Sequence, residues 1–113
     1  MKRDVRTYLH DMLDACRAIH QHVAGRSLDD YRRQRTIRSA VERELSLIGE
    51  AAAAIRKVEP NQLARITDAG KIIGLRNQLA QGYFNVRDEE IWGIIEQNLP
   101  ILTQELEKLL TDA

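Results

Sequence analysis

Apolar residues recur at steps of three and four along almost the whole chain, and this spacing is the strongest constraint on the fold. Residues three or four positions apart lie on one face of an α-helix. The first series predicts a helix over roughly residues 5–24, with Asp4 as its N-cap and Gly25 as its stop. A second series predicts a long helix that ends before Pro60. The two series are Val5, Leu9, Met12, Cys16, Ile19 and Val23, then Ile37, Val41, Leu45, Ile48, Ala52 and Ile55.

The remaining segments also have helical signals. Ser27 and Asp30 resemble a capping box, with Asp in place of the usual Glu or Gln. A third helix is expected over about residues 69–81, where a glycine then marks its end. A fourth begins near Asp88, and Pro100 is expected to kink it because proline lacks a backbone donor. No segment alternates with the period of two that strands require.

Length and composition fit one globular domain. The chain has 113 residues, of which 43% are hydrophobic and 30% charged, and its formal net charge is zero. Its single cysteine allows neither an internal disulfide nor a thiolate metal cluster. No apolar run approaches the roughly 20 residues of a membrane span. We therefore expect one cytoplasmic all-α domain over residues 1–113, an antiparallel bundle of about four helices.

Charges are distributed unevenly along the sequence. Residues 26–44 contain six arginines and four acids, whereas residues 87–113 contain seven acids and two basic residues. One interpretation is a solvated helix face with pairs such as Arg38 and Glu42, one turn apart. The other is a weak RNA-binding patch that attracts phosphate. The residues proposed for that patch are Arg32, Arg35 and Arg38.

Other reactive residue types give weak signals. His20 and His22 are two positions apart, which directs them to different sides of a helix, and His10 supplies no ligand spacing. We expect surface histidines and no metal site. Cys16 belongs to the first apolar stripe and is expected to lie in the core.

Two polar features are harder to explain by packing. Glu50 is the one carboxylate in the small and apolar run 45–54, so it needs a cationic or hydrogen-bonding partner or a place at a groove. The segment 74–84 gathers polar side chains around the end of the third helix, with Asn77 and Gln81 one turn apart. Its polar members include Arg76, Asn77, Gln81 and Tyr83.

These segments resemble a known family. The pattern Arg76-Asn77-x-x-x-Gln81-x-Tyr83 is similar to the Arg-Asn-x-x-x-His-x-Tyr signature of HEPN-type toxins of the HepT class. These are small helical ribonucleases paired with a minimal nucleotidyltransferase antitoxin. The segments 48–51, 83–86, 91–92 and 98–100 also match the family, so the resemblance covers essentially the whole chain. It implies a two-fold homodimer that cleaves RNA without metal or cofactor at a composite site across its interface.

The resemblance also implies residue roles. Arg76 would hold the scissile phosphate, and Asn77 would position RNA or fix the helix end. Gln81 stands where the family has its catalytic histidine. Tyr83 would receive AMP from the antitoxin. We expect Glu50 either to orient Arg76 across a helix interface or to form an unrelated packing pair.

Gln81 departs from the family pattern in a way that bears on catalysis. An amide cannot exchange a proton near neutral pH, whereas histidine has a pKa near 6.5. The chain is therefore expected to be inactive as a nuclease. It is either an inactivated variant of an active toxin or a natural non-catalytic module that still binds a nucleotidyltransferase, and the sequence leaves both open.

Overall fold

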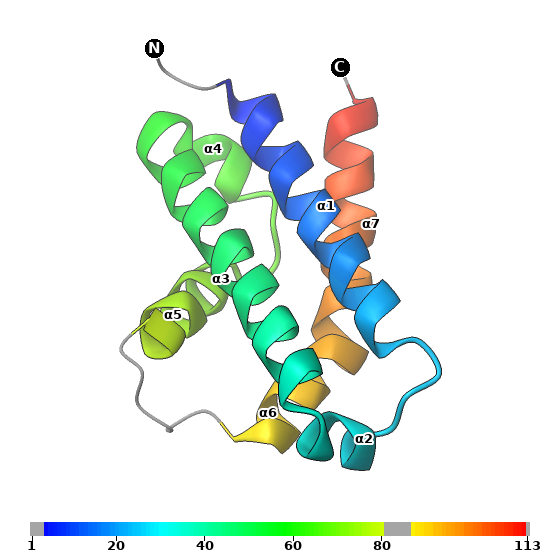
Figure 1. Ribbon diagram of the computed structural model, residues 1–113. Helices are drawn as coiled ribbons and strands as arrows, with labels where there is room; N and C mark the ends of the chain where they lie inside the picture. The colour runs from blue at the N-terminus through cyan, green and yellow to red at the C-terminus, as the bar shows by residue number, and fades with distance from the viewer. Residues whose placement is uncertain (1–3, 81–86, 113) are drawn as a thin grey trace.

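The computed structural model describes residues 4–80 and 87–112, and every regular element in these ranges is helical. This confirms the all-α prediction. Long α1 runs opposite to α3 and to α7, so the bundle is antiparallel (Figure 1). The elements are α1 (Val5–Val23), α2 (Leu28–Arg33), α3 (Arg35–Val58), α4 (Pro60–Leu63), α5 (Ala69–Ala80), α6 (Asp88–Gly93), the π-helical turn η1 (Ile94–Asn98) and α7 (Leu99–Thr111).

Helix α1 has the expected ends. The side chain of Asp4 accepts a hydrogen bond from the Arg6 amide at 3.1 Å, which satisfies a free donor of the first turn. Gly25 follows the helix with a φ of +73°, a left-handed conformation that glycine adopts without a Cβ clash. The thiol-bearing Cys16 is buried in the stripe that faces the core, as predicted.

The predicted capping box is present, but it begins a short helix. The Asp30 amide donates to Ser27 Oγ at 3.2 Å, and the Ser27 amide donates to Asp30 Oδ2 at 3.0 Å. Helix α2 then stops at Gln34, whose backbone is extended with φ −108° and ψ 96°. The sequence pattern had not predicted this break before α3.

Arg38 accounts for part of this break. Its Nη1 donates to the carbonyls of Tyr31 (3.3 Å) and Arg32, which belong to the last turn of α2. Helix C-termini leave carbonyls without intrahelical donors, and a nearby arginine satisfies them. The spacing of apolar residues does not predict a cap that a side chain of the following helix supplies.

Proline marks two further differences from the prediction. The long helix ends before Pro60 as expected, but Pro60 also begins the unpredicted single turn α4. The expected disturbance near Pro100 takes the form of the π-helical turn η1, which directly precedes α7. Pro100 cannot donate to the carbonyl four residues earlier, and a π turn is one way to absorb that loss.

The core lies where α1 packs against α3 and against α7, with α5 packed on the far side of α3 (Figure 1). At the other end of the molecule, Tyr31 is completely buried, and its ring lies 5.6 Å from that of Trp92, between centroids. This aromatic contact packs α2 against α6. The contact stabilises this end of the fold by the apolar ring surface that it removes from water.

We predict that Ser27→Ala lowers the free energy of unfolding by about 1 kcal/mol, because α2 loses its N-terminal acceptor. Urea unfolding followed by circular dichroism measures the change. Ser39→Ala is the control, since Ser39 is an exposed serine within α3, and it should leave stability nearly unchanged. Equal losses in both variants would contradict the capping interpretation.

Candidate active site

Helix α5 carries the first half of the polar motif and is fixed at its start by α7. Glu105 of α7 accepts hydrogen bonds from the Thr67 amide, at 3.0 and 3.3 Å, and from Thr67 Oγ1 at 2.6 Å. Asp68, the next residue, has a φ of +58°, a conformation that Asp tolerates better than most side chains. The Asp68 carbonyl then accepts from Lys71 and Ile72 to open the helix.

Farther along, α5 lies directly against α3. Gly49 of α3 is buried, and a Cβ built on it would overlap the Cβ of Arg76. That Cβ would also lie 3.1 Å from Arg76 Cγ and 3.1 Å from the Ile72 carbonyl oxygen. The aliphatic stem of Arg76 therefore occupies the space that a side chain at position 49 would need. The sequence pattern had indicated no role for Gly49 itself.

The head of Arg76 is held by its neighbour. Asn77 Oδ1 accepts hydrogen bonds from Arg76 Nε at 3.1 Å and from Nη2 at 2.7 Å. Arg76 is half-buried and Asn77 is exposed. The arrangement leaves the outer edge of the guanidinium, with Nη1 and the second Nη2 hydrogen, directed away from this bond. That edge is the donor pair that guanidinium groups use to bind phosphate.

Two motif positions lie outside the described residues. These are Gln81, at the position of the family histidine, and Tyr83, the expected site of AMP transfer. Their assignments stay predictions from the sequence.

Glu50 lies at a groove, one of the places expected for it. It is exposed and lines a hollow of about 670 Å³ between α1 and α3, together with Tyr8, Asp11 and Asp14 of α1. Among the described residues, Glu50 forms no hydrogen bond or ion pair with Arg76. Its neighbour on α3, Gly49, lies directly against this arginine.

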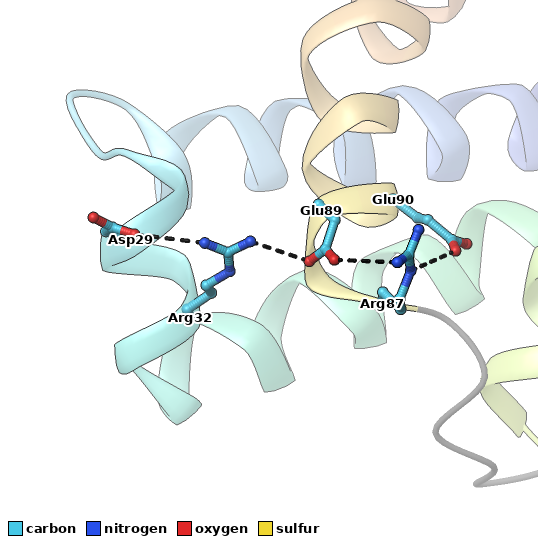
Figure 2. A network of polar contacts seen from close by, with 5 residues as sticks. All are labelled: Asp29, Arg32, Arg87, Glu89 and Glu90. Carbon is cyan, nitrogen blue, oxygen red and sulfur yellow. Dashed lines mark hydrogen bonds and ion pairs between the residues drawn. The ribbon is translucent and has the colours of Figure 1, made fainter.

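The predicted arginine patch is partly used inside the molecule. Arg32 bridges Asp29 at 3.6 Å and Glu89 of α6 at 3.2 Å, and Figure 2 shows this chain of charges continuing to Arg87, which pairs with Glu89 and Glu90. The network joins α2 to the first turn of α6. It had not been anticipated, because charge pairs between distant segments leave no periodic signal.

The other two arginines of the predicted patch differ in their surroundings. Arg38 caps α2, as described above, and is half-buried. Arg35 is exposed, and its side chain forms no hydrogen bond or ion pair with the residues that the structure describes, 4–80 and 87–112. RNA binding by these arginines stays a prediction, for which Arg35 is the best placed.

Titratable groups near the α2–α6 contact are perturbed by burial. Burial, and then the charge of Asp88, raise the pKa of half-buried Glu42, while Arg38 acts in the opposite direction. Burial also raises the pKa of Tyr31, and Glu42 and Asp88 add to the effect. Among the described residues, the buried Tyr31 hydroxyl has no hydrogen-bond partner. The immediate surroundings of Glu42 and Tyr31 therefore disfavour negative charge.

The remaining candidates give no catalytic signal. Burial raises the pKa of the Cys16 thiol to about 11, so it is neither a thiolate nor accessible. His10, His20 and His22 are exposed, as predicted. The described part of the chain holds no group of three side chains suited to a metal ion. Within the same ranges, no helix has both the length and the apolar character needed to cross a membrane.

The fold and the α5 motif define a small all-α domain of the HEPN class, and comparison with known proteins specifies its family. A family model described as ribonuclease HepT-like matches residues 12–109. The match covers most of the chain, which therefore belongs to the HepT-like ribonuclease family. This confirms the resemblance found in the sequence.

Several relatives align over nearly their full length. “Putative RNase MJ0127” of Methanocaldococcus jannaschii is 29% identical over 111 residues, covering 98% of this chain and 91% of the relative. “Putative RNase TTE0752” of Caldanaerobacter subterraneus is 29% identical over 105 residues, covering 93% of each. “Probable ribonuclease HepT” of Thermococcus cleftensis is 29% identical over 112 residues, covering 96% of this chain and 98% of the relative. No solved structure matches the chain significantly.

We predict that Glu42→Gln raises stability at neutral pH, because ionised Glu42 is unfavourable in the folded state. A carboxyl whose pKa is raised on folding costs stability once it ionises. The gain should be full at pH 7 and should disappear below about pH 4, where glutamate is protonated in both states. Urea unfolding from pH 3 to 8 measures it. A gain of equal size at pH 3 and at pH 7 would contradict this interpretation.

Proposed function

We propose that the chain is the toxin component of a toxin–antitoxin pair, built on a metal-independent ribonuclease site in the cytoplasm. The observation that carries the proposal is the guanidinium of Arg76, which is held by Asn77 and whose outer edge, without a partner among the described residues, can bind phosphate at the start of the family motif. Membership in the HepT-like ribonuclease family and the ribonuclease names of the relatives support the substrate class.

The chemistry divides between two kinds of group. A guanidinium holds the scissile phosphate and stabilises charge that develops on its oxygens in the transition state. Cleavage also needs a group that takes a proton from the attacking oxygen and returns one to the leaving oxygen. Arg76 supplies the first function. Gln81 cannot supply the second, so this chain binds RNA but cleaves it poorly.

A non-catalytic module is the alternative. In that case the chain persists because it binds a nucleotidyltransferase, and the RNA-binding edge of Arg76 has no role in its function. The two possibilities differ in whether a single substitution at position 81 restores cleavage. The natural coding sequence at that position also separates them, whereas a nucleotidyltransferase gene beside it would support the family assignment in either case.

We predict that Gln81→His restores RNA cleavage that does not require a metal ion. General acid–base transfer typically contributes about 10²- to 10⁴-fold, and the substituted chain should gain a rate of this order. The assay is cleavage of labelled RNA in the presence of EDTA. Arg76→Ala in the Gln81→His background should abolish the activity.

The site assignment is wrong if the chain with Gln81 already cuts RNA at a rate that Arg76→Ala does not change. Arg17→Ala serves as a matched control. Arg17 is an exposed arginine of α1 that pairs only loosely with Glu107, at 3.9 Å, so its loss should leave cleavage unchanged.

We predict that the protein is a homodimer in which both copies of the motif form one composite site. One short motif from a single small chain offers few groups with which to enclose an RNA phosphate, and a two-fold axis doubles them. Multi-angle light scattering at micromolar concentration should give twice the chain mass. A strict monomer would exclude the composite site.

We predict that a cognate nucleotidyltransferase transfers AMP from ATP to Tyr83. The added phosphate and bulk beside Arg76 would compete with RNA for the same guanidinium, and the reaction needs no histidine at position 81. Intact mass spectrometry after incubation with ATP and magnesium should detect one or more AMP units. These units should be absent from Tyr83→Phe, and a gain that persists there would place the modification elsewhere.

A further inference from the structure

We propose that Gly49 is a positioning residue for Arg76, because the missing side chain at position 49 lets the arginine stem lie directly on α3. The inference rests on the proposed function, since it concerns how the same arginine meets RNA phosphate. A residue of α3 thereby helps to orient the phosphate-binding side chain of α5.

The contact at Gly49 involves atoms that cannot easily move. A Cβ at position 49 would overlap Arg76 Cβ, and the Ile72 carbonyl oxygen would lie 3.1 Å away. The first belongs to the fixed root of a side chain and the second to the backbone one turn earlier. A rotamer change of the arginine therefore relieves neither contact. A methyl group at position 49 must displace α5 as a whole.

Other helical glycines do not have this property. A Cβ built on Gly70, Gly74 or Gly93 meets no atom within 4 Å in the described structure. Glycine inside a helix lowers the free energy of unfolding by about 0.5–1 kcal/mol relative to alanine. A helical glycine that no neighbouring atom requires therefore only destabilises the protein. At position 49, the space is occupied by Arg76.

Two contacts together orient the guanidinium, one with the aliphatic part of the Arg76 side chain and one with its polar head. Gly49 places the Cβ and Cγ of Arg76 against α3, and Asn77 Oδ1 holds Nε and Nη2. Together these contacts limit the directions in which the outer edge of the guanidinium can point. Prior orientation of this kind matters because a misplacement of about 1 Å at a reacting group can cost about 10²-fold in rate.

The test measures RNA binding by the chain with Gln81, so that cleavage does not interfere. Fluorescence anisotropy with a short single-stranded RNA gives the affinity at several salt concentrations. Arg76→Ala should weaken binding by about tenfold, as expected for a charged hydrogen bond. The slope of log affinity against log salt should fall by about 0.7 for each RNA phosphate that the variant no longer neutralises.

Gly49→Ala should give the same fall in affinity and in salt slope as Arg76→Ala. The double variant Gly49→Ala/Arg76→Ala should bind no more weakly than Arg76→Ala alone, because both changes remove the same interaction with phosphate. Gly93→Ala is the matched control, since its Cβ enters open space, and it should retain affinity and slope.

The outcomes separate this inference from the proposed function. If Arg76→Ala leaves RNA binding unchanged, the proposed function fails. If Arg76→Ala weakens binding and Gly49→Ala does not, or if the two losses add, the positioning role of Gly49 is wrong while the function stands.

A folding defect in Gly49→Ala would also be informative. Arg76→Gly removes the Cβ with which the new methyl collides, so Gly49→Ala should cost less stability in that background than in the original chain. An equal cost in both backgrounds would show that the collision with Arg76 is unimportant, and would overturn the inference.

Discussion

Helix α3 must bury two faces at once, and the rest of the structure depends on how it does so. It packs against α1 on one side and α5 on the other. Large side chains on both faces would hold the neighbouring helices at the usual spacing of about 8–10 Å. The run of small residues in its second half permits a closer approach. The buried members of this run are Gly49, Ala51, Ala52 and Ala53.

This constraint explains why the site depends on packing more than on polar contacts. Arg76 is placed by backbone and aliphatic atoms at the α3–α5 crossing, and its polar restraint comes from the adjacent residue. The ion pairs of Figure 2 are all substantially exposed, and such pairs contribute about 0–1 kcal/mol each. They orient α6 against α2 but cannot substitute for the helix crossing.

The sequence predicted the parts of the fold that have a local or periodic cause. The apolar stripes, the Asp4 cap and the Gly25 stop depend on neighbours within a few residues. The break at Gln34 was missed because the side chain that caps α2, Arg38, belongs to the next helix, and a side-chain cap leaves no trace in the spacing of apolar residues. The network of Arg32 with Glu89 joins residues 57 positions apart.

The same distinction applies to the site. Arg76 and Asn77 were found because they are adjacent within a family motif. Glu50 was singled out because a charge in an apolar run is conspicuous. Gly49, which lies against Arg76, has no side chain that a sequence pattern could identify. A glycine in a helix becomes informative only when the facing helix is known.

The arrangement around Arg76 also bears on the meaning of Gln81. Replacement of histidine by glutamine removes proton transfer, whereas the contacts with Arg76 that lie within the described residues come from Gly49 and Asn77. Because the same glycine also lets α5 lie directly against α3, a non-catalytic module would need it for packing as well. Restoration of cleavage by Gln81→His, rather than the presence of Gly49, therefore separates an inactivated nuclease from a binding module.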